Sequence, residues 1–120
     1  MQNQKSVLIQ KSYKFSLDII SFCQKLPKER VYWIISDQLL RSSTSIGDNI
    51  IEAQSSSSKK DFARFFQIVL KSANESEYWI GLSIDSGLAV GKEKLKILLA
   101  KLKEICRIPA KSLLTMKNKC

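Results

Sequence analysis

The sequence predicts an all-α protein, an antiparallel up-down-up-down four-helix bundle. Only four glycines and two prolines occur in 120 residues, whereas a β-sandwich or barrel needs a turn signal every ~8–12 residues. Apolar residues recur at steps of three and four over long stretches, which is the helical period. The loops between these stretches are short and make neighbouring helices antiparallel. The length suits a single domain covering residues 1–120.

The first two predicted helices cover about residues 5–26 and 28–54. Pro27 separates them, because proline cannot continue a helix. The first helix has an apolar face made of Leu8, Phe15, Ile19, Phe22 and Leu26, and the second has one made of Tyr32, Ile35, Leu39, Ile46, Ile50 and Ala53. Gly47 costs about 1 kcal/mol relative to alanine inside a helix, so we expect another helix to approach closely there.

The third predicted helix covers about residues 59–86. Ser58 precedes it as an N-cap, because the acidic Asp61 follows three positions later. The segment after the helix contains Gly87 and Gly91, which favour a helix end and a turn.

The fourth predicted helix covers about residues 92–108, where a regular apolar seam consists of Leu95, Leu98, Leu99, Leu102, Ile105 and Cys106. Pro109 should end or kink this helix, since it lacks a backbone N–H. Residues 110–120 are expected to form a C-terminal tail that adds a further short helical turn or frays.

Several chemistries are not indicated by the composition. Cys23, Cys106 and Cys120 are an odd number without a CxxC pair, and the chain has no histidine, so neither a disulfide framework nor a zinc site is expected. There is no phosphate-binding GxxxxGK[ST] and no Cys/His pair. We therefore predict no enzyme activity, no catalytic residue, no metal or other cofactor, and no small-molecule substrate.

The location predicted from the sequence is the bacterial cytoplasm, without membrane association. The N-terminal residues MQNQKSVLIQK lack an apolar stretch long enough for secretion. No apolar run approaches the ~18–20 residues that a membrane span requires.

Positive charge is concentrated toward the ends of the chain. Residues 1–30 carry six basic and two acidic side chains, residues 31–90 carry five and seven, and residues 91–120 carry nine and two. The candidate nucleic-acid-binding residues are Lys92, Lys94, Lys96, Lys101, Lys103, Arg107 and Lys111. Clustered cations bind phosphate by releasing counterions; the alternative is a solvated helix face that serves solubility.

The second helix also carries polar residues at three- and four-residue steps, namely Arg41, Ser45, Asn49 and Glu52. Polar groups beside a core must be hydrogen-bonded, at a cost of ~1–3 kcal/mol for each one left unpaired. Glu75 and Glu77 on the third helix are acceptors for the Arg41 guanidinium. A structural hydrogen-bond network is favoured over a metal site, because a di-iron bundle uses Glu-x-x-His motifs.

Two pairs of adjacent aromatic residues, Tyr32–Trp33 and Tyr78–Trp79, lie within predicted helices. Adjacent helical side chains cannot both face one core. One member of each pair is therefore a candidate interface residue, since aromatics are enriched in interface hot spots. The alternative is that it packs on a neighbouring helix.

Segment 38–53, QLLRSSTSIGDNIIEA, followed by KDFARFFQIVLKSANESEYWI at 60–80, resembles a bacterial four-helix bundle family. Its members include proteins encoded in intervening sequences of 23S ribosomal RNA genes and the accessory variability determinant of diversity-generating retroelements. The family pattern Arg-x3-Ser-Ile-x2-Asn-Ile-x-Glu, then Ser-x2-Glu, is matched by Arg41, Ser45, Ile46, Asn49, Ile50, Glu52, Ser72 and Glu75. The family often has Glu-Gly where this chain has Glu52-Ala53. The resemblance covers about residues 10–107.

The resemblance implies an antiparallel four-helix subunit that assembles into a homopentameric ring. In the retroelement branch, the basic assembly binds nucleic acid and partners a reverse transcriptase. The predicted function is thus a non-enzymatic oligomeric accessory protein that binds RNA or DNA weakly and without sequence specificity, with a retroelement reverse transcriptase as a candidate partner. The alternative is a ring-forming protein-interaction scaffold, whose basic charge serves solubility or an acidic protein partner.

Overall fold

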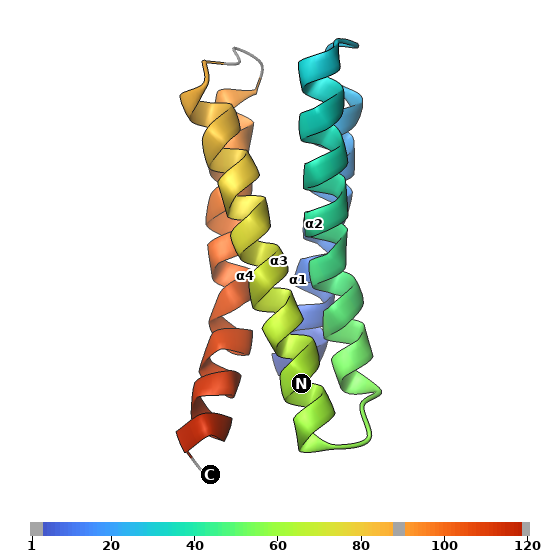
Figure 1. The fold of residues 1–120 in the computed structure, drawn as a ribbon, viewed down its shortest axis with the longest axis vertical. Coiled ribbons are helices and arrows are strands. Elements are labelled where there is room, and N and C mark those ends of the chain that lie inside the picture. The colour runs from blue at the N-terminus through green and yellow to red at the C-terminus, as the bar shows by residue number, and fades with distance from the viewer. Residues whose placement is uncertain (1–3, 88–90, 119–120) are drawn as a thin grey trace.

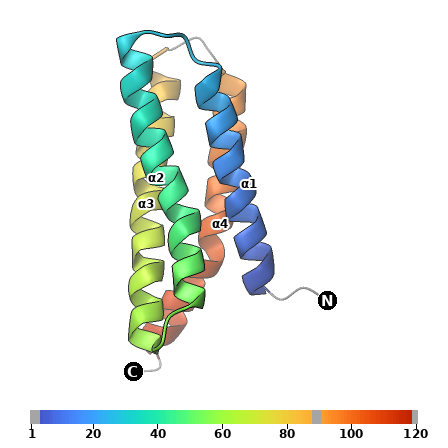
Figure 2. The ribbon, with the colours of Figure 1, turned by 90° about the vertical axis from the view of Figure 1, so that its right-hand side faces the viewer.

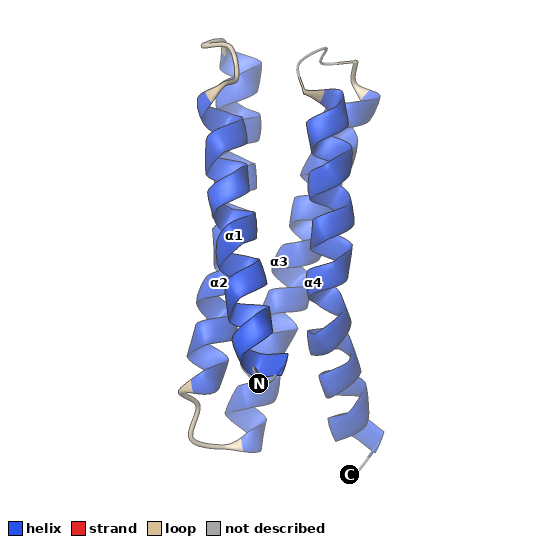
Figure 3. Ribbon diagram, turned by 180° about the vertical axis from the view of Figure 1, so that it is seen from behind, coloured by secondary structure: helices blue, strands red, loops and turns tan. Residues whose placement is uncertain are grey.

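The structure is a computed structural model that describes residues 4–87 and 91–118, and these residues form four helices. The helices are α1 (Gln4–Gln24), α2 (Arg30–Gln54), α3 (Lys59–Asp85) and α4 (Lys92–Asn118). No strand occurs in these two ranges (Figure 3). The prediction of an all-α four-helix fold is confirmed.

The four helices pack in a two-by-two arrangement. Each helix runs antiparallel to the next one along the chain (Figures 1 and 2), and α1 also packs on α4. Within the described ranges, α1 and α3 have no close backbone contact, nor do α2 and α4, so these pairs lie diagonally. The shortest dimension is 20 Å, which equals about two helix diameters.

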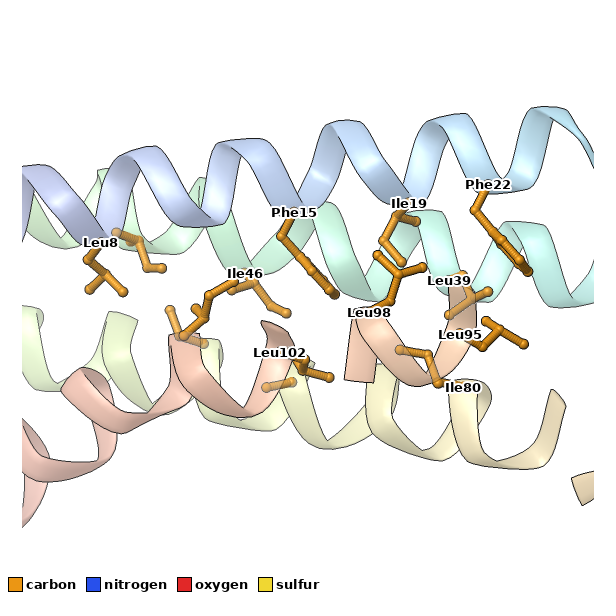
Figure 4. Close-up of a cluster of buried hydrophobic side chains, with 14 of the residues drawn as sticks. Leu8, Phe15, Ile19, Phe22, Leu39, Ile46, Ile80, Leu95, Leu98 and Leu102 are labelled. Carbon is orange, nitrogen blue, oxygen red and sulfur yellow. The ribbon is translucent and has the colours of Figure 1, made fainter. Parts of the chain in front are cut away.

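The core is formed by the apolar stripes that the helical period places on the inner face of each helix (Figure 4). Its fully buried large members are Phe15, Ile19, Leu39, Ile46, Ile50, Val69, Ile80, Leu95, Leu98 and Leu102. Burial of one such side chain contributes ~1.5–3 kcal/mol. This apolar packing holds the four helices together.

Local signals fix the ends of α3. The Ser58 hydroxyl accepts a hydrogen bond from the backbone N–H of Asp61 at 3.1 Å, so the predicted N-cap is confirmed. Gly87 follows the helix with φ 74°, a conformation that disfavours residues with a Cβ. Gly91 has φ 72°, and a Cβ there would lie 2.6 Å from the Phe22 ring, so this position requires glycine.

Gly47 lies in the contact between α2 and α1, so another helix does approach it, as predicted. A Cβ at Gly47 would lie 3.6 Å from Ser12 Oγ and 3.7 Å from Ser16 Oγ. These are ordinary van der Waals distances. The site has space for a methyl group, so the approach of α1 does not itself require glycine.

The predicted end of the fourth helix near residue 108 was wrong, because α4 continues through Pro109 to Asn118. Residues 110–118 are therefore helical, while 119–120 lie outside the described part of the chain. Proline in a helix interior removes one backbone hydrogen bond, at a cost of about 3 kcal/mol. The Pro109 ring is fully buried, and Leu113 packs one turn later against the core, so tertiary packing offsets that cost.

Candidate functional site

A chain of serine hydroxyls joins α2 to α3 inside the bundle. Ser42, Ser43 and Ser76 are each 0% exposed. Ser76 Oγ donates to Ser42 Oγ at 2.8 Å, and Ser42 Oγ donates to the Gln38 carbonyl at 2.8 Å. Ser43 Oγ lies 3.2 Å from Ser76 Oγ and must be the donor, because Ser76 has already used its only proton. Each hydroxyl in the chain thus donates once.

The polar motif of α2 continues this contact toward the surface. Ser72 Oγ donates to Ser45 Oγ at 2.9 Å, and Asn49 Nδ2 donates to the same oxygen at 3.1 Å. Asn49 also donates to the Ser45 backbone carbonyl at 2.8 Å. No buried side-chain nitrogen or oxygen in the described part of the chain lacks a partner.

Arg41 closes the contact at the surface through Glu75. Its Nη2 lies 2.6 Å from Glu75 Oε2 and donates to Gln38 Oε1 at 2.8 Å. Arg41 is more than half exposed, and surface ion pairs contribute only ~0–1 kcal/mol. The Glu52 side chain is exposed, and its carboxylate has no hydrogen bond or ion pair with any described residue. The structure therefore brings together Arg41, Ser45, Asn49 and Glu75 of the predicted motif, but not Glu52.

Replacing Ser76 by alanine should lower the free energy of unfolding by ~1–3 kcal/mol, because Ser43 then loses its buried acceptor. Urea denaturation measures the difference. Thr44→Ala is the matched control, since the exposed Thr44 hydroxyl donates only within its own helix, to the Leu40 and Arg41 carbonyls, and it should change stability by less than ~0.5 kcal/mol. Equal effects of the two substitutions would contradict a stabilising role for the hydroxyl chain.

The predicted basic residues of α4 divide into two groups. We call the exposed set Lys92, Lys96, Lys103, Arg107 and Lys111 the basic strip. Its members follow at four- and seven-residue steps and fall within an arc of about 100° on the helix, over a length of about 28 Å. Lys94 is also exposed, but it lies seven residues before Lys101 on another face of α4, the face nearer α1. Lys101 is half-buried and binds Asp18, with Nζ 3.0 Å from Oδ2.

Asp18 is a nearly buried carboxylate between α1 and α4. It accepts from Lys101 at 3.0 Å and from Lys14 at 3.1 Å. Burial alone raises the pKa of Asp18, but the hydrogen bonds and positive charges of the two lysines outweigh burial and hold the pKa below its ordinary value of 3.8. Lys11 and Glu104 form a second ion pair between the same helices.

Asp18→Asn should lower the free energy of unfolding by ~1–3 kcal/mol at neutral pH, through the loss of charge-assisted hydrogen bonds. Because folding lowers the pKa of Asp18, its stabilisation is complete above pH 3.8 and is lost as the pH falls through the folded-state pKa. The difference between wild type and variant should therefore shrink in acid, as measured by urea denaturation across the pH range.

Asp37→Asn provides the control for this titration, because the Asp37 side chain is exposed. Its effect should stay below ~0.5 kcal/mol. An Asp18→Asn effect that did not change between neutral and strongly acidic pH would contradict the ion-pair account.

The aromatic pairs each divide between the core side and the surface. Trp33 is 60% and Tyr78 61% exposed, while Tyr32 and Trp79 are half-buried. Trp79 packs against the core, and its ring meets Tyr78 edge-on at 5.3 Å between centroids. Trp33 and Tyr78 are thus the members available for an interface.

Exposed apolar side chains continue from these aromatics along both sides of α2. The first apolar strip consists of Tyr13, Leu17, Ile20 and Trp33. Ile20 and Trp33 line one groove of about 440 Å³ between α1 and α2, and Leu17 and Tyr13 follow Ile20 on the same face at steps of three and four. The second apolar strip consists of Val31, Ile34, Tyr78 and Leu82, at the end of the α2–α3 contact beyond the Ser42–Ser76 bond.

The cysteines show no sign of a reactive or metal-binding site. Burial raises the pKa of Cys23, and burial together with the charge of Glu77 raises the pKa of Cys106 to about 11. Both thiols are protonated at neutral pH and are poor nucleophiles. No group of metal-binding side chains gathers among the described residues, and Cys120 lies outside them. None of the helices as described is long and apolar enough to cross a membrane.

Two features of the structure were not predicted, or only partly predicted, from the sequence. The Asp18–Lys101 pair was missed, although an isolated acid flanking an apolar stripe (between Phe15 and Ile19) is a signal for a buried partner. The hydroxyl chain was also only partly foreseen, because Ser76 is one of many serines and its partners depend on the register of α2 and α3.

These features define a class of protein: a small all-α four-helix bundle in which hydroxyl groups join α2 and α3. Within that class, a family model described as 23S rRNA-intervening sequence protein matches residues 4–111. The chain belongs to this family, which confirms the resemblance seen in its α2 and α3 motifs.

A solved structure supports the assignment. A protein of unknown function from the S23 ribosomal protein family of Bacteroides thetaiotaomicron VPI-5482 matches this fold with a TM-score of 0.84 and 33% identity. The match covers 92% of this chain and 98% of the other. The comparison with curated proteins returns no match. Neither the family description nor that of the solved structure names a catalytic activity.

Proposed function

We propose that this protein is a non-enzymatic accessory subunit that assembles with copies of itself and binds RNA or DNA through α4, without sequence specificity. The basic strip is the observation that supports nucleic-acid binding. It presents exposed cations along about 28 Å of helix, and such cations bind phosphate by releasing counterions. The strip contains no Asn or Gln that would read base edges. By resemblance, a retroelement reverse transcriptase is a candidate partner of the assembly.

Few carboxylates oppose the charge of the strip. Glu93 is 3.7 Å from Lys96 but 87% exposed, so solvent screens that pair. Glu104 interacts most strongly with Lys11 from α1 and only weakly with Arg107 of the strip, so it neutralises little of the strip's charge. The potential along α4 remains positive, which favours a polyanion over solvation alone as the role of this surface.

Nucleic-acid binding is tested with a single-stranded RNA oligonucleotide by fluorescence anisotropy. Engagement of all five cations of the strip predicts an affinity loss of about 10²-fold between ~50 and ~200 mM salt. In the Lys103→Gln/Arg107→Gln variant, the logarithmic salt slope should become shallower by about one to two units, with a similar change on every sequence tested.

The matched control is Lys25→Gln/Lys71→Gln, which removes the same charge from exposed positions outside α4. It should leave the salt slope close to that of the wild type. Equal losses in the two double variants, or binding that is flat with salt, would reject α4 as a nucleic-acid surface and favour the scaffold alternative.

Self-association is supported by the two apolar strips that flank α2. A ring needs a heterologous interface, in which two different patches of the same subunit meet. The first and second apolar strips are two such patches on adjacent sides of the bundle. Because α4 is diagonal to α2, contacts through both strips leave the basic strip free for a partner.

Light scattering should therefore give a mass several times 13.7 kDa, about five subunits by resemblance. Trp33→Glu on the first strip and Leu82→Glu on the second should each break the assembly, because a buried unpaired charge is costly. An equimolar mixture of the two variants should form dimers, since each supplies the intact strip that the other lacks. Ile97→Glu, an exposed position on α4, should leave the mass unchanged. A monomeric wild type would refute the assembly.

A further inference from the structure

An apolar groove lies between the first turns of α3 and the last turns of α4. It has a volume of about 920 Å³, and carbon-rich side chains form most of its wall, among them Phe62, Ala63, Leu113 and Leu114. Leu114 is 60% exposed although it is a large apolar residue. The two helices spread apart toward this end of the bundle (Figure 1).

The continuation of α4 past Pro109 creates this groove. α1 as described begins at Gln4, short of this end of the bundle (Figures 1 and 3), so α1 does not cover the last turns of α4. Leu113 packs against the core, but Leu114 in the same stretch stays 60% exposed. This end of the molecule therefore has exposed apolar surface beside the groove.

The rim of the groove is basic. Lys59 and Lys60 border it on α3, and Lys117 borders it on α4. Asp61, the acidic residue in the first turn of α3, does not line the groove. Its Oδ1 lies 3.9 Å from Nε of Arg64. An occupant must therefore combine apolar groups for the wall with negative charge for the rim.

The length of the groove fits two turns of a helix. Ala110 to Lys117 on α4 covers about 10 Å of helix axis, which is the separation of residues i and i+7 in an incoming helix. An amphipathic helix buries apolar anchors at i, i+3, i+4 and i+7 in such a groove. A second copy of this chain is disfavoured as the occupant, because none of its four helices is strongly acidic: α2, the most acidic, has three acidic and two basic residues.

We propose that the groove between the first turns of α3 and the last turns of α4 is a docking site for an acidic amphipathic helix of a partner protein. Leucine-like side chains of the partner contact Phe62 and Leu114, and its flanking carboxylates meet Lys59, Lys60 and Lys117. Phosphate groups gain nothing from an apolar wall, so the groove suits a different class of ligand from the basic strip. The site adds a protein partner to the proposed function.

The probe is a labelled synthetic peptide of about four helical turns, with leucines on one face at helical spacing and glutamates elsewhere. Fluorescence anisotropy should show saturable binding, and a scrambled peptide of the same composition should bind at least about tenfold more weakly. Leu114→Glu places a carboxylate in the groove and should weaken binding of the amphipathic peptide by about tenfold or more. Since Leu114 is mostly exposed, thermal unfolding of this variant should match that of the wild type.

Ile97→Glu is the matched control, because it makes a similar change at an exposed apolar position elsewhere on α4; it should leave peptide binding unchanged. Equal binding of the scrambled peptide, or an equal loss in both variants, would overturn the proposal. A change of particle mass in Leu114→Glu would assign the groove to a second copy instead. Loss of oleate or oligouridylate binding in Leu114→Glu, with peptide binding intact, would assign it to a lipid or to nucleic acid.

Discussion

The contact between α2 and α3 is the interaction on which the remaining packing depends. Its interior is lined by serines, whose small side chains let the two helices lie close, and whose hydroxyls bond to one another and to the Gln38 carbonyl. A hydroxyl chain of this kind needs one register, because a slip of one helical turn would leave Ser76 without its partners on α2. The pair therefore fixes the relative position of two helices before α1 and α4 are considered.

The other side of the bundle is closed differently. α1 and α4 meet through ion pairs at their edges, Lys101 with Asp18 and Lys11 with Glu104, in addition to the shared core. Only the Asp18 pair is shielded enough to matter for stability. Because α1 is also the shortest helix, the α1–α4 side leaves the last turns of α4 uncovered. The register set by α2 and α3, and the shorter α1, together determine where apolar surface is exposed.

Periodicity alone was sufficient to predict the number and type of the helices, since their apolar stripes repeat over many turns. The Ser58 N-cap was also readable, because its hydrogen bond joins residues three apart in the sequence. Pro109 misled the prediction, since its local cost is offset by burial that only the tertiary structure reveals. The partners of Ser76 and Lys101 could not be predicted either, because they lie more than thirty positions away in the sequence and are brought together only by the tertiary structure.

Charge counts have the same limitation when they are used to locate a binding surface. Residues 91–120 form the most basic quarter of the sequence, but position decides which of these cations a ligand can reach. Lys101 is bound by Asp18, Lys117 borders an apolar groove, and the basic strip retains the residues that share one exposed arc. A polyanion and an acidic helix would thus meet different parts of the same helix. Since Pro109 separates most of the strip from the groove, the residue that obscured the end of α4 also lies close to the boundary between its two surfaces.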